Sequence, residues 1–370
     1  MEWLIVFGSL AWIGLLLLPW RPWSTRERLE ATGLNSPTGE LADISVLIPA
    51  RNEEASIDRT LRALAGQEQG LQIFLINDQS TDHTSERAQA IGLSNLTIVE
   101  GGELPGSWIG KLWALEQGRR LVTSRFVLLL DADIELAPGI VSVLREKLLS
   151  EHLDLVSIMA MLRTDHFWER WLVPAFVFFF KLIYPFALGN SLKNRLGVAA
   201  GGCILLRTEV LTAIGGFETV RNAVIDDCAL AQRVKDTGGR TWIGLSHSVR
   251  SHRLYPNLSS FWAMVSRTAY TQLHYSIVIL LAVTCFMLII FWAPFLAITT
   301  ASWPLKALAF AGWCCLIGAY LPTVRFYRMS PFWTVTLPII ATLYLLMTWS
   351  SAIAYWKGRR SVWKGRVYAR

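Results

Sequence analysis

The chain has 370 residues, 53% of them hydrophobic, and a formal net charge of +7. This apolar fraction is too high for an ordinary soluble enzyme. The charge is uneven, because residues 43–275 hold 23 basic and 24 acidic side chains, whereas the tail 357–370 holds six basic and no acidic ones. The basic excess therefore indicates anionic lipid headgroups as a partner, and no nucleic-acid partner is expected.

Residues 1–23 predict an amino-terminal membrane anchor. The stretch from Trp3 to Trp20 carries no charge and has a tryptophan at each end, as membrane segments often do. A cleavable signal peptide is the alternative, but the stretch lacks a basic leader and a small-residue cleavage site.

Residues 276–356 predict further membrane helices, which are followed by the basic tail 357–370. A cytosolic domain followed by three spans would place that tail outside, against the usual inside preference of basic residues. The proline-containing segment 303–324 is therefore a candidate re-entrant segment. The five cysteines show no disulfide or metal spacing, which favours a reducing, cytosolic face for the domain between the membrane segments.

Residues 24–42 predict a polar linker and residues 43–275 a single α/β domain. Four apolar runs alternate with helical patterns: "ISVLIPA", "LQIFLIN", "LTIVE" and "FVLLL". Such alternation predicts a mostly parallel sheet with right-handed crossovers, whose ligand crevice lies at the carboxyl ends of the strands. Segment 167–189 is apolar but contains two prolines and Lys181, so an interfacial helix is preferred to a spanning one.

Polar clusters follow three of the apolar runs, at residues 51–54, 77–82 and 131–133. Along an extended strand, Asp131 and Asp133 would lie on the same side. Two like charges so close together need a cation between them, and hard oxygen ligands suit Mg²⁺ or Mn²⁺. The alternative is a strand that ends in a solvated acidic turn, but the recurrence of polar clusters at one edge favours a metal site.

The order of these clusters resembles the inverting nucleotide-sugar glycosyltransferases of the GT-A fold. That family includes dolichyl-phosphate mannose synthase, ceramide glucosyltransferase and cellulose synthase, and bacterial hopene-associated glycosyltransferases are the nearest likeness. The resemblance covers nearly the whole chain. It implies a GT-A, Rossmann-like fold with a mostly parallel sheet, helices on both faces, and membrane helices at the amino and carboxyl ends.

On the nucleotide side, "LIPARNEE" resembles the first family strand, which implies donor-binding roles for Pro49, Ala50, Arg51 and Glu53. "INDQSTD" resembles a turn that usually has two aspartates followed by Gly-Ser. Asp78 keeps the position used on the base, whereas Asn77 and Gln79 depart from the pattern. These departures leave uridine and guanosine both open as the base.

Three further residues resemble the diphosphate and metal positions of the family. Lys111, in a Gly-Lys pair, corresponds to a lysine near the diphosphate, although a solvated helix start is the alternative. Asp131 and Asp133 correspond to the metal motif, with Asp133 as the more direct ligand. A divalent ion there would stabilise the charge that develops on the leaving group.

The acceptor side resembles the family at two further pairs. Gly201 and Gly202 would let backbone approach a sugar closely, although an ordinary turn is the alternative. Asp227 corresponds to the catalytic carboxylate, a general base, with Asp226 in place of the usual glutamate neighbour. Simple capping of the following helix is the alternative, but capping needs only one acid.

The last family motif, Gln-x-x-Arg-Trp on an interfacial helix, is not intact in this chain. "SFWAMVSRTAYTQLHYS" occupies its place, so Trp262 and Arg267 are candidates for comparable contacts with the diphosphate.

Together the resemblance implies a membrane-bound, metal-dependent, inverting hexosyltransferase. It would move a sugar from a nucleotide-diphosphate sugar, with UDP favoured, to a lipid acceptor of hopanoid-related type. The expected location is the bacterial inner membrane, with the catalytic domain in the cytosol. A processive polysaccharide synthase, a transporter or scaffold, and an inactive nucleotide-sugar binder remain the competing interpretations.

Overall fold

The computed structural model describes residues 2–31, 40–300, 302–364 and 366–369. The chain forms two compact units, each assembled from separate parts of the sequence. The helical unit comprises Met1–Arg26, Thr164–Ala187 and Tyr255–Arg370, and the sheet unit comprises Glu27–Arg163 and Leu188–Leu254. The range 43–275 that the sequence predicts as one domain therefore includes parts of both units.

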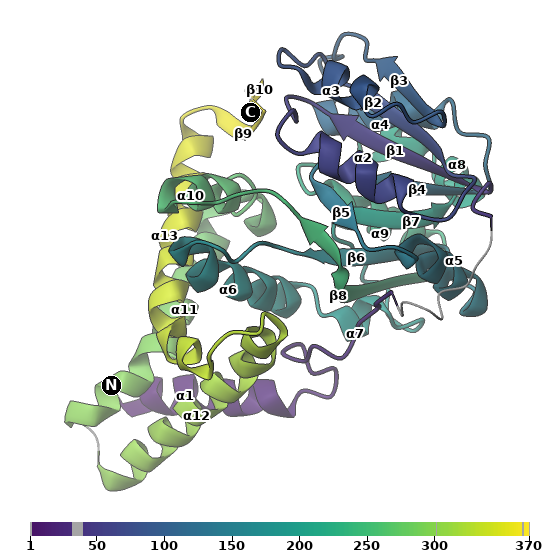
Figure 1. Cartoon of the computed structure of the whole chain (residues 1–370). Helices are drawn as coiled ribbons and strands as arrows, with labels where there is room; N and C mark the ends of the chain where they lie inside the picture. Colours follow the sequence, from purple (N-terminus) through teal and green to yellow (C-terminus); the bar gives the residue numbers. More distant parts are fainter. Residues whose placement is uncertain (1, 32–39, 301, 365, 370) are drawn as a thin grey trace. The chain divides into compact units, whose positions relative to one another are not determined.

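In the described residues, the sheet unit is built on one eight-stranded sheet with the strand order β3-β2-β1-β4-β7-β6-β8-β5 (Figure 1). The strands are β1 (Ile44–Ala50), β2 (Gln72–Asn77), β3 (Leu96–Glu100), β4 (Phe126–Leu130), β5 (Ile134–Leu136), β6 (Leu155–Met161), β7 (Cys203–Arg207) and β8 (Thr241–Ser251). The four apolar runs recognised in the sequence are β1, β2, β3 and β4.

The sheet is mixed, although its first half agrees with the expected parallel arrangement. Strands β3, β2, β1 and β4 are parallel neighbours. Strand β7 then runs antiparallel to both β4 and β6, and β5 is antiparallel to β8. Strands β6 and β8 are parallel to each other. The expectation of parallel strands is therefore correct for β3, β2, β1 and β4, the half of the sheet in which polar residues follow the strands.

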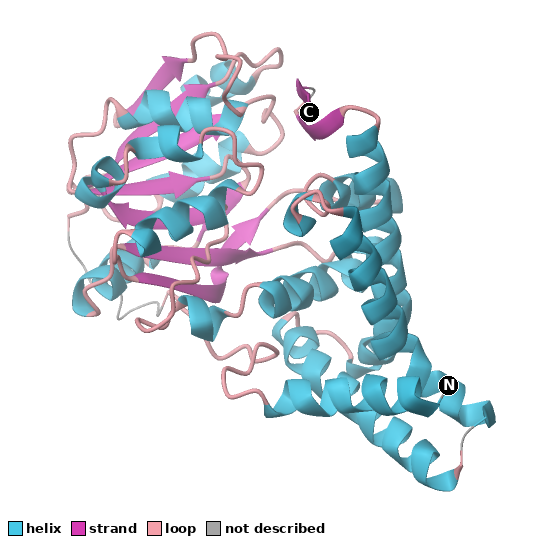
Figure 2. Cartoon of the chain, turned by 180° about the vertical axis from the view of Figure 1, so that it is seen from behind, coloured by secondary structure: helices cyan, strands magenta, loops and turns pink. Residues whose placement is uncertain are grey.

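Helices cover both faces of this sheet (Figure 2), as the resemblance implied. One face carries α2 (Ile57–Ala65), α3 (Thr84–Ala90) and α5 (Ile140–Ser150), and the other carries α4 (Gly110–Arg119), α8 (Thr208–Ala213), η2 (Gly216–Val220) and α9 (Asp226–Asp236). Successive residues of a strand point to opposite faces. Val46 and Ile48 accordingly join the first core, and Leu47 joins the second. Burial on both faces explains why β1 and β4 are continuous apolar runs.

The predicted linker 24–42 is partly integrated into the sheet unit. Residues 32–39 lie outside the described residues. Leu29 donates a backbone hydrogen bond to the Leu245 carbonyl (3.1 Å). The Glu30 carboxylate accepts hydrogen bonds from the backbone N–H groups of His247 and Ser248. This part of the segment is therefore held against β8.

The helical unit contains α1 (Glu2–Leu17), α6 (Phe167–Ile183), the first half of α7 (Phe186–Gly189), α10 (Leu258–Ser266), η3 (Thr271–Leu273), α11 (Ile277–Thr300), α12 (Trp303–Phe326), η4 (Pro331–Thr336), α13 (Leu337–Trp356), β9 (Arg359–Trp363) and β10 (Arg366–Ala369). In the described chain, three segments are long and apolar enough to cross a membrane: Ile277–Ile298, Trp303–Phe326 and Pro331–Trp356. Because α12 is one continuous helix, it shows no break of the kind that a re-entrant segment would have.

Helix α1 is apolar but has only 16 residues, so it is shorter than the predicted anchor. It packs closely on two of the long helices. A Cβ on Gly8 would lie 2.7 Å from the Ile289 carbonyl, and one on Gly312 would lie 2.7 Å from the Ser9 Cα. The Trp12 indole donates to the Ile290 carbonyl at 2.8 Å. Such contacts between small residues are typical of helix packing in membranes.

Helix α6 occupies most of the segment that the sequence predicts as interfacial. Its 17 residues are fewer than the roughly 20 that a spanning helix needs. Two charged side chains of α6 are buried within the helical unit, and one of them, Lys181, donates to the Ser24 carbonyl at 2.7 Å. At its amino-terminal end, the exposed ring of Phe167 contacts Trp171 and Trp333. An aromatic cluster of this kind is typical of a membrane–water interface.

Candidate active site

The polar clusters recognised in the sequence lie at the carboxyl ends of adjacent parallel strands. Arg51 follows β1, Asp78 follows β2 and Asp131 follows β4. Asp78 donates its backbone N–H to the Ala50 carbonyl (2.8 Å), and Asp131 donates to the Gly202 carbonyl (3.0 Å). The parallel half of the sheet therefore gathers these loops along one edge.

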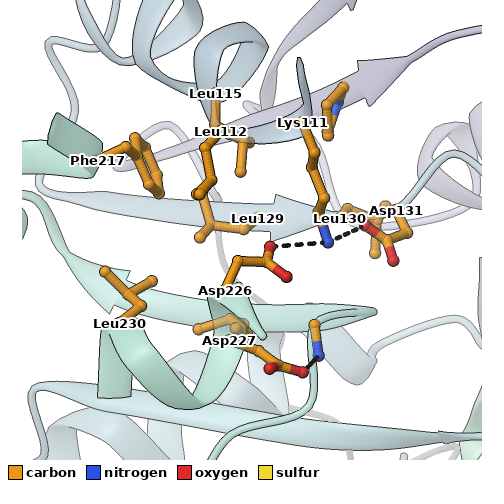
Figure 3. Close-up of a pocket in the computed structure, with 13 residues that line it drawn as sticks. Lys111, Leu112, Leu115, Leu129, Leu130, Asp131, Phe217, Asp226, Asp227 and Leu230 are labelled. Atoms are coloured by element: carbon orange, nitrogen blue, oxygen red, sulfur yellow. Dashed lines mark hydrogen bonds and ion pairs between the residues drawn. The ribbon is translucent and has the colours of Figure 1, made fainter. Parts of the chain in front are cut away.

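A pocket at this edge contains the group that we call the lysine cluster: Lys111, Asp131, Asp226 and Asp227 (Figure 3). Lys111 Nζ lies 2.8 Å from Asp131 Oδ1 and 3.3 Å from Asp226 Oδ2. Lys111 comes from the start of α4, and both Asp226 and Asp227 come from the start of α9. Pro49 and Gly201 also line the pocket.

Electrostatic interactions in the lysine cluster shift several protonation equilibria. Burial lowers the pKa of Lys111, but the carboxylates of Asp131 and Asp226 more than compensate, so the pKa is raised and the ammonium stays charged. Burial raises the pKa of Asp131, and the attraction of Lys111 opposes only part of this effect. Lys111 is therefore a fixed positive charge inside the pocket.

Two backbone N–H groups hold the Asp227 carboxylate in place. Its Oδ2 accepts a hydrogen bond from the Gly201 N–H at 2.8 Å, and its Oδ1 accepts one from the Cys228 N–H at 2.7 Å. Burial, together with the neighbouring Asp226 carboxylate, raises the pKa of Asp227 to about 6. A carboxylate with this pKa is ionised at neutral pH and is a stronger base than an ordinary aspartate, which suits proton abstraction.

Asp133 belongs to a second group, which we call the arginine cluster: Glu53, Asp133 and Arg253. Arg253 Nε lies 3.3 Å from Asp133 Oδ2, and its Nη2 lies 2.8 Å from Glu53 Oε1. Ser251 Oγ also donates to Asp133 Oδ2, at 2.6 Å. Burial raises the pKa of Asp133, but Arg253 and the Ser251 hydroxyl outweigh this effect, so the pKa is lowered overall.

The turn after β2 has an unusual backbone conformation at Gln79, one of the two residues that differ from the family pattern. Gln79 has a φ of 55°, in the left-handed region that favours glycine, which is the usual family residue there. Arg51 stabilises the turn, because its Nη1 donates hydrogen bonds to the carbonyls of Asp78 (2.6 Å) and Gln79 (2.9 Å). At the other departure, the Asn77 amide donates to Glu100 Oε2 at 2.7 Å.

Residues 45–215 match the sequence model of the family described as Glycosyl transferase family 2. This stretch is a family 2 glycosyltransferase domain. The chain is also 26% identical over 209 residues, 55% of its length, to a 4,4'-diaponeurosporenoate glycosyltransferase of Staphylococcus aureus. Its counterpart in Staphylococcus haemolyticus is 37% identical over 95 residues, or 25% of this chain. The matches span 54% and 24% of these two relatives.

Nearly the whole chain is also similar to a solved structure. A mannosyltransferase from Pyrobaculum calidifontis, solved with GDP-Man and Mn²⁺, superposes with a TM-score of 0.57 at 18% identity. The superposition covers 95% of this chain and 98% of the neighbour. The fold is therefore GT-A-like, as the sequence predicted.

The site residues predicted from the sequence divide between the two units. Those in the sheet unit are Pro49, Ala50, Arg51, Glu53, Asp78, Lys111, Asp131, Asp133, Gly201, Gly202, Asp226 and Asp227. Trp262 lies in α10 of the helical unit, and Arg267 follows that helix directly. Their roles at the diphosphate stay a prediction.

Sequence reasoning did not pair Arg253 or Ser251 with Asp133, although both contact its carboxylate. A usable signal was present, because both residues lie at the end of β8, just as the acidic clusters follow β2 and β4. The pairing itself required the fold, since Arg253 is 120 positions from Asp133.

The carboxylate oxygens of Asp131 and Asp133 are of the type that a hard divalent cation prefers. Among the described residues, no cluster of three or more His, Cys, Asp or Glu side chains is arranged to hold a metal ion. Asp131 faces the pocket, and Asp133 lies two residues further along the same loop. Phosphate oxygens of a donor would have to supply further ligands, as is common for Mg²⁺ sites.

Proposed function

We propose that the protein is a membrane-bound, inverting glycosyltransferase that moves a sugar from a nucleotide-diphosphate sugar to a lipid acceptor. The observation that supports this proposal most directly is the lysine cluster. It combines a fixed cation, Lys111, with a carboxylate of raised pKa, Asp227, in one pocket of a family 2 domain. A cation near a diphosphate and a base near an acceptor hydroxyl are the two elements that such a displacement needs.

In the proposed reaction, Asp227 accepts the proton of the acceptor hydroxyl as that oxygen attacks the anomeric carbon. The bond between this carbon and the diphosphate oxygen breaks, and the nucleoside diphosphate leaves with the electron pair. The Gly201 and Cys228 N–H groups hold the Asp227 carboxylate in place. Lys111 stabilises the negative charge that develops on the leaving group. One displacement with one base inverts the configuration of the sugar carbon.

Asp131 and Asp133 are the residues that would hold a divalent cation, Mg²⁺ or Mn²⁺. When bound, such an ion would neutralise charge on the diphosphate. The Mn²⁺ bound to the mannosyltransferase of Pyrobaculum calidifontis is consistent with this assignment. On the nucleotide side, Pro49, Ala50, Arg51, Glu53 and Asp78 are the proposed donor contacts, with a UDP-sugar as the favoured donor.

The acceptor is proposed to be a lipid, and a hopanoid-related lipid is our specific candidate. Within the part of the chain that the structure describes, three helices are long and apolar enough to cross a membrane. The two staphylococcal relatives are named for a glycosyl transfer to 4,4'-diaponeurosporenoate. We place the catalytic domain on the cytosolic face of a bacterial inner membrane, where nucleotide sugars are made.

The test uses the full chain in detergent with native lipid extract and a panel of UDP- and GDP-sugars. Asp227→Asn should lower kcat by about 10²- to 10⁴-fold while nucleotide-sugar binding persists. Asp226→Asn is the matched control, because it removes a neighbouring carboxylate without removing the base. Mass spectrometry of the lipid product identifies the acceptor, and repeated sugar additions would instead indicate a polysaccharide synthase. Donor binding without any transfer in the wild type would identify an inactive binder and contradict the proposal.

A further inference from the structure

Arg253 joins two loops that the proposed function uses for different parts of the donor. Its Nη2 lies 2.8 Å from Glu53 Oε1, in the loop after β1, and its Nε lies 3.3 Å from Asp133 Oδ2, in the loop after β4. Arg253 itself lies two residues beyond the end of β8. One guanidinium thus bridges a proposed nucleotide contact and a proposed metal ligand.

The positive charge of Arg253 compensates the two negative charges of Glu53 and Asp133, which would be unfavourable without a cation nearby. The side chains of Asp133 and Glu53 are only 9% and 12% exposed. Two carboxylates this poorly solvated need a cation nearby, and the two-pronged guanidinium can reach both. The Asp133 oxygen that faces Arg253 also accepts the Ser251 hydroxyl hydrogen bond, at 2.6 Å. That oxygen therefore has two hydrogen-bond donors from the chain itself.

The two clusters differ in how firmly their cation is enclosed. The Arg253 side chain is 38% exposed, whereas that of Lys111 is 18% exposed. An exposed guanidinium can turn towards solvent or towards a phosphate, which it binds well through paired N–H groups. Arg253 is thus the cation that can leave its carboxylate when a better anion is present.

We propose that Arg253 is a resident counter-cation that occupies Asp133 in the donor-free enzyme and gives way only when divalent metal and nucleotide diphosphate bind together. This inference rests on the proposed function. A divalent ion alone must compete with the guanidinium for Asp133. A diphosphate removes this competition, because it offers Arg253 a new partner and supplies the metal with further oxygens. Arg253 is therefore a positioning residue that couples metal binding to donor binding.

The test measures Mn²⁺ binding to the full chain in detergent by electron paramagnetic resonance, with MnCl₂ alone and with MnCl₂ plus UDP or GDP. In the wild type, the nucleotide should tighten Mn²⁺ binding by about tenfold or more. In Arg253→Met, Mn²⁺ alone should bind about tenfold more tightly than to the wild type, and the effect of the nucleotide should shrink accordingly. Arg253→Lys keeps the positive charge beside Asp133, so Mn²⁺ alone should bind about as weakly as to the wild type. It loses the paired N–H groups, so the tightening by nucleotide should be smaller than in the wild type.

A charge-balanced variant guards against misfolding of Arg253→Met. The double variant Arg253→Met with Glu53→Gln removes one positive and one negative charge, so the net charge of the arginine cluster is unchanged. It should also bind Mn²⁺ alone more tightly than the wild type, because Asp133 has lost its competitor. A general change in electrostatic potential cannot account for that result.

Equal Mn²⁺ affinity in the wild type and the double variant would overturn the inference. If Asp227-dependent sugar transfer persists in that case, the proposed function still stands. Absence of Mn²⁺ binding from every form, with and without nucleotide, would overturn both the inference and the metal dependence. The transferase activity itself would then be judged by the Asp227→Asn experiment alone.

Discussion

Asp131 and Asp133 lie two residues apart, yet their electrostatic surroundings are opposite. Asp131 lines the pocket and shares Lys111 with Asp226, and its pKa is raised. Asp133 is bound by Arg253 and by the Ser251 hydroxyl, and its pKa is lowered. The two acids of one short motif therefore belong to different clusters.

The comparison shows that each acid is matched to a cation from a different part of the chain. The cation of the lysine cluster sits at the start of α4, where the following helix fixes its position. The cation of the arginine cluster follows β8 and is more exposed. We infer that the lysine cluster keeps the same geometry during the reaction. The arginine cluster, in contrast, rearranges when the donor binds.

Removal of the Lys111 charge is expected to have the largest effect and tests whether the lysine cluster supports the chemical step. Lys111→Met should lower kcat by about 10²- to 10³-fold, because a preorganised charge at the leaving group is lost. It should also lower the free energy of unfolding by about 1–3 kcal/mol, less than for a fully buried pair because these side chains are partly exposed. Steady-state kinetics and thermal unfolding in detergent measure the two effects.

Lys111→Arg is the control for that experiment. It keeps the charge but changes the geometry, so stability should recover further than activity does. Wild-type kcat in Lys111→Met would contradict a role for Lys111 at the leaving group.

The pH dependence of sugar transfer tests Asp227 as the general base. Asp227 must be ionised to accept a proton, so kcat/KM should fall about tenfold per pH unit below its pKa of about 6. Asp226→Asn removes a like charge, which should lower the pKa of Asp227 and move this acidic limb to lower pH. Rates of sugar transfer between pH 4.5 and 8 measure both profiles. An acidic limb that stays in place in Asp226→Asn would argue against Asp227 as the titrating group.

Alanine substitutions at two adjacent glycines, Gly201 and Gly202, would place a methyl group next to different side chains. Their comparison tests whether steric contact with the lysine cluster affects catalysis. A Cβ at Gly201 would lie 3.1 Å from Lys111 Nζ and 3.4 Å from Asp227 Oδ2, so Gly201→Ala should displace these two side chains and lower kcat by about tenfold. A Cβ at Gly202 would instead meet the Ile134 side chain at 3.1 Å. Gly202→Ala should therefore affect thermal stability more than kcat. Similar kinetic effects of the two substitutions would show that Gly201 has no special relation to the cluster.

The smallest expected effect concerns the arginine cluster. Ser251→Ala removes the 2.6 Å hydrogen bond to Asp133 and should lower the free energy of unfolding by about 1–2 kcal/mol. Arg253 remains in place, so the carboxylate keeps its counter-charge. Thermal unfolding of the full chain measures the change, and a larger loss than that of Lys111→Met would reverse the order of the two clusters.

Much of the candidate site could be predicted because its residues sit at strand ends that local patterns reveal. Asp131 follows five apolar residues, and Asp227 lies in the first turn of a helix. The pairing of Lys111 with both Asp131 and Asp226 could not be predicted in this way, because the three residues are brought together by β4, α4 and α9. The pairing of Arg253 with Asp133 was missed for the same reason.

Composition and short-range periodicity alone predicted the apolar segments that are long enough to cross a membrane, the strands of the parallel half of the sheet and the order of the motifs. The three-dimensional fold, in contrast, sets the antiparallel direction of β7 within the sheet and the assembly of the helical unit from three separate parts of the chain. It also decided which cation neutralises which acid. Contacts between distant residues depend on how strands and helices pack, and no local pattern encodes that information.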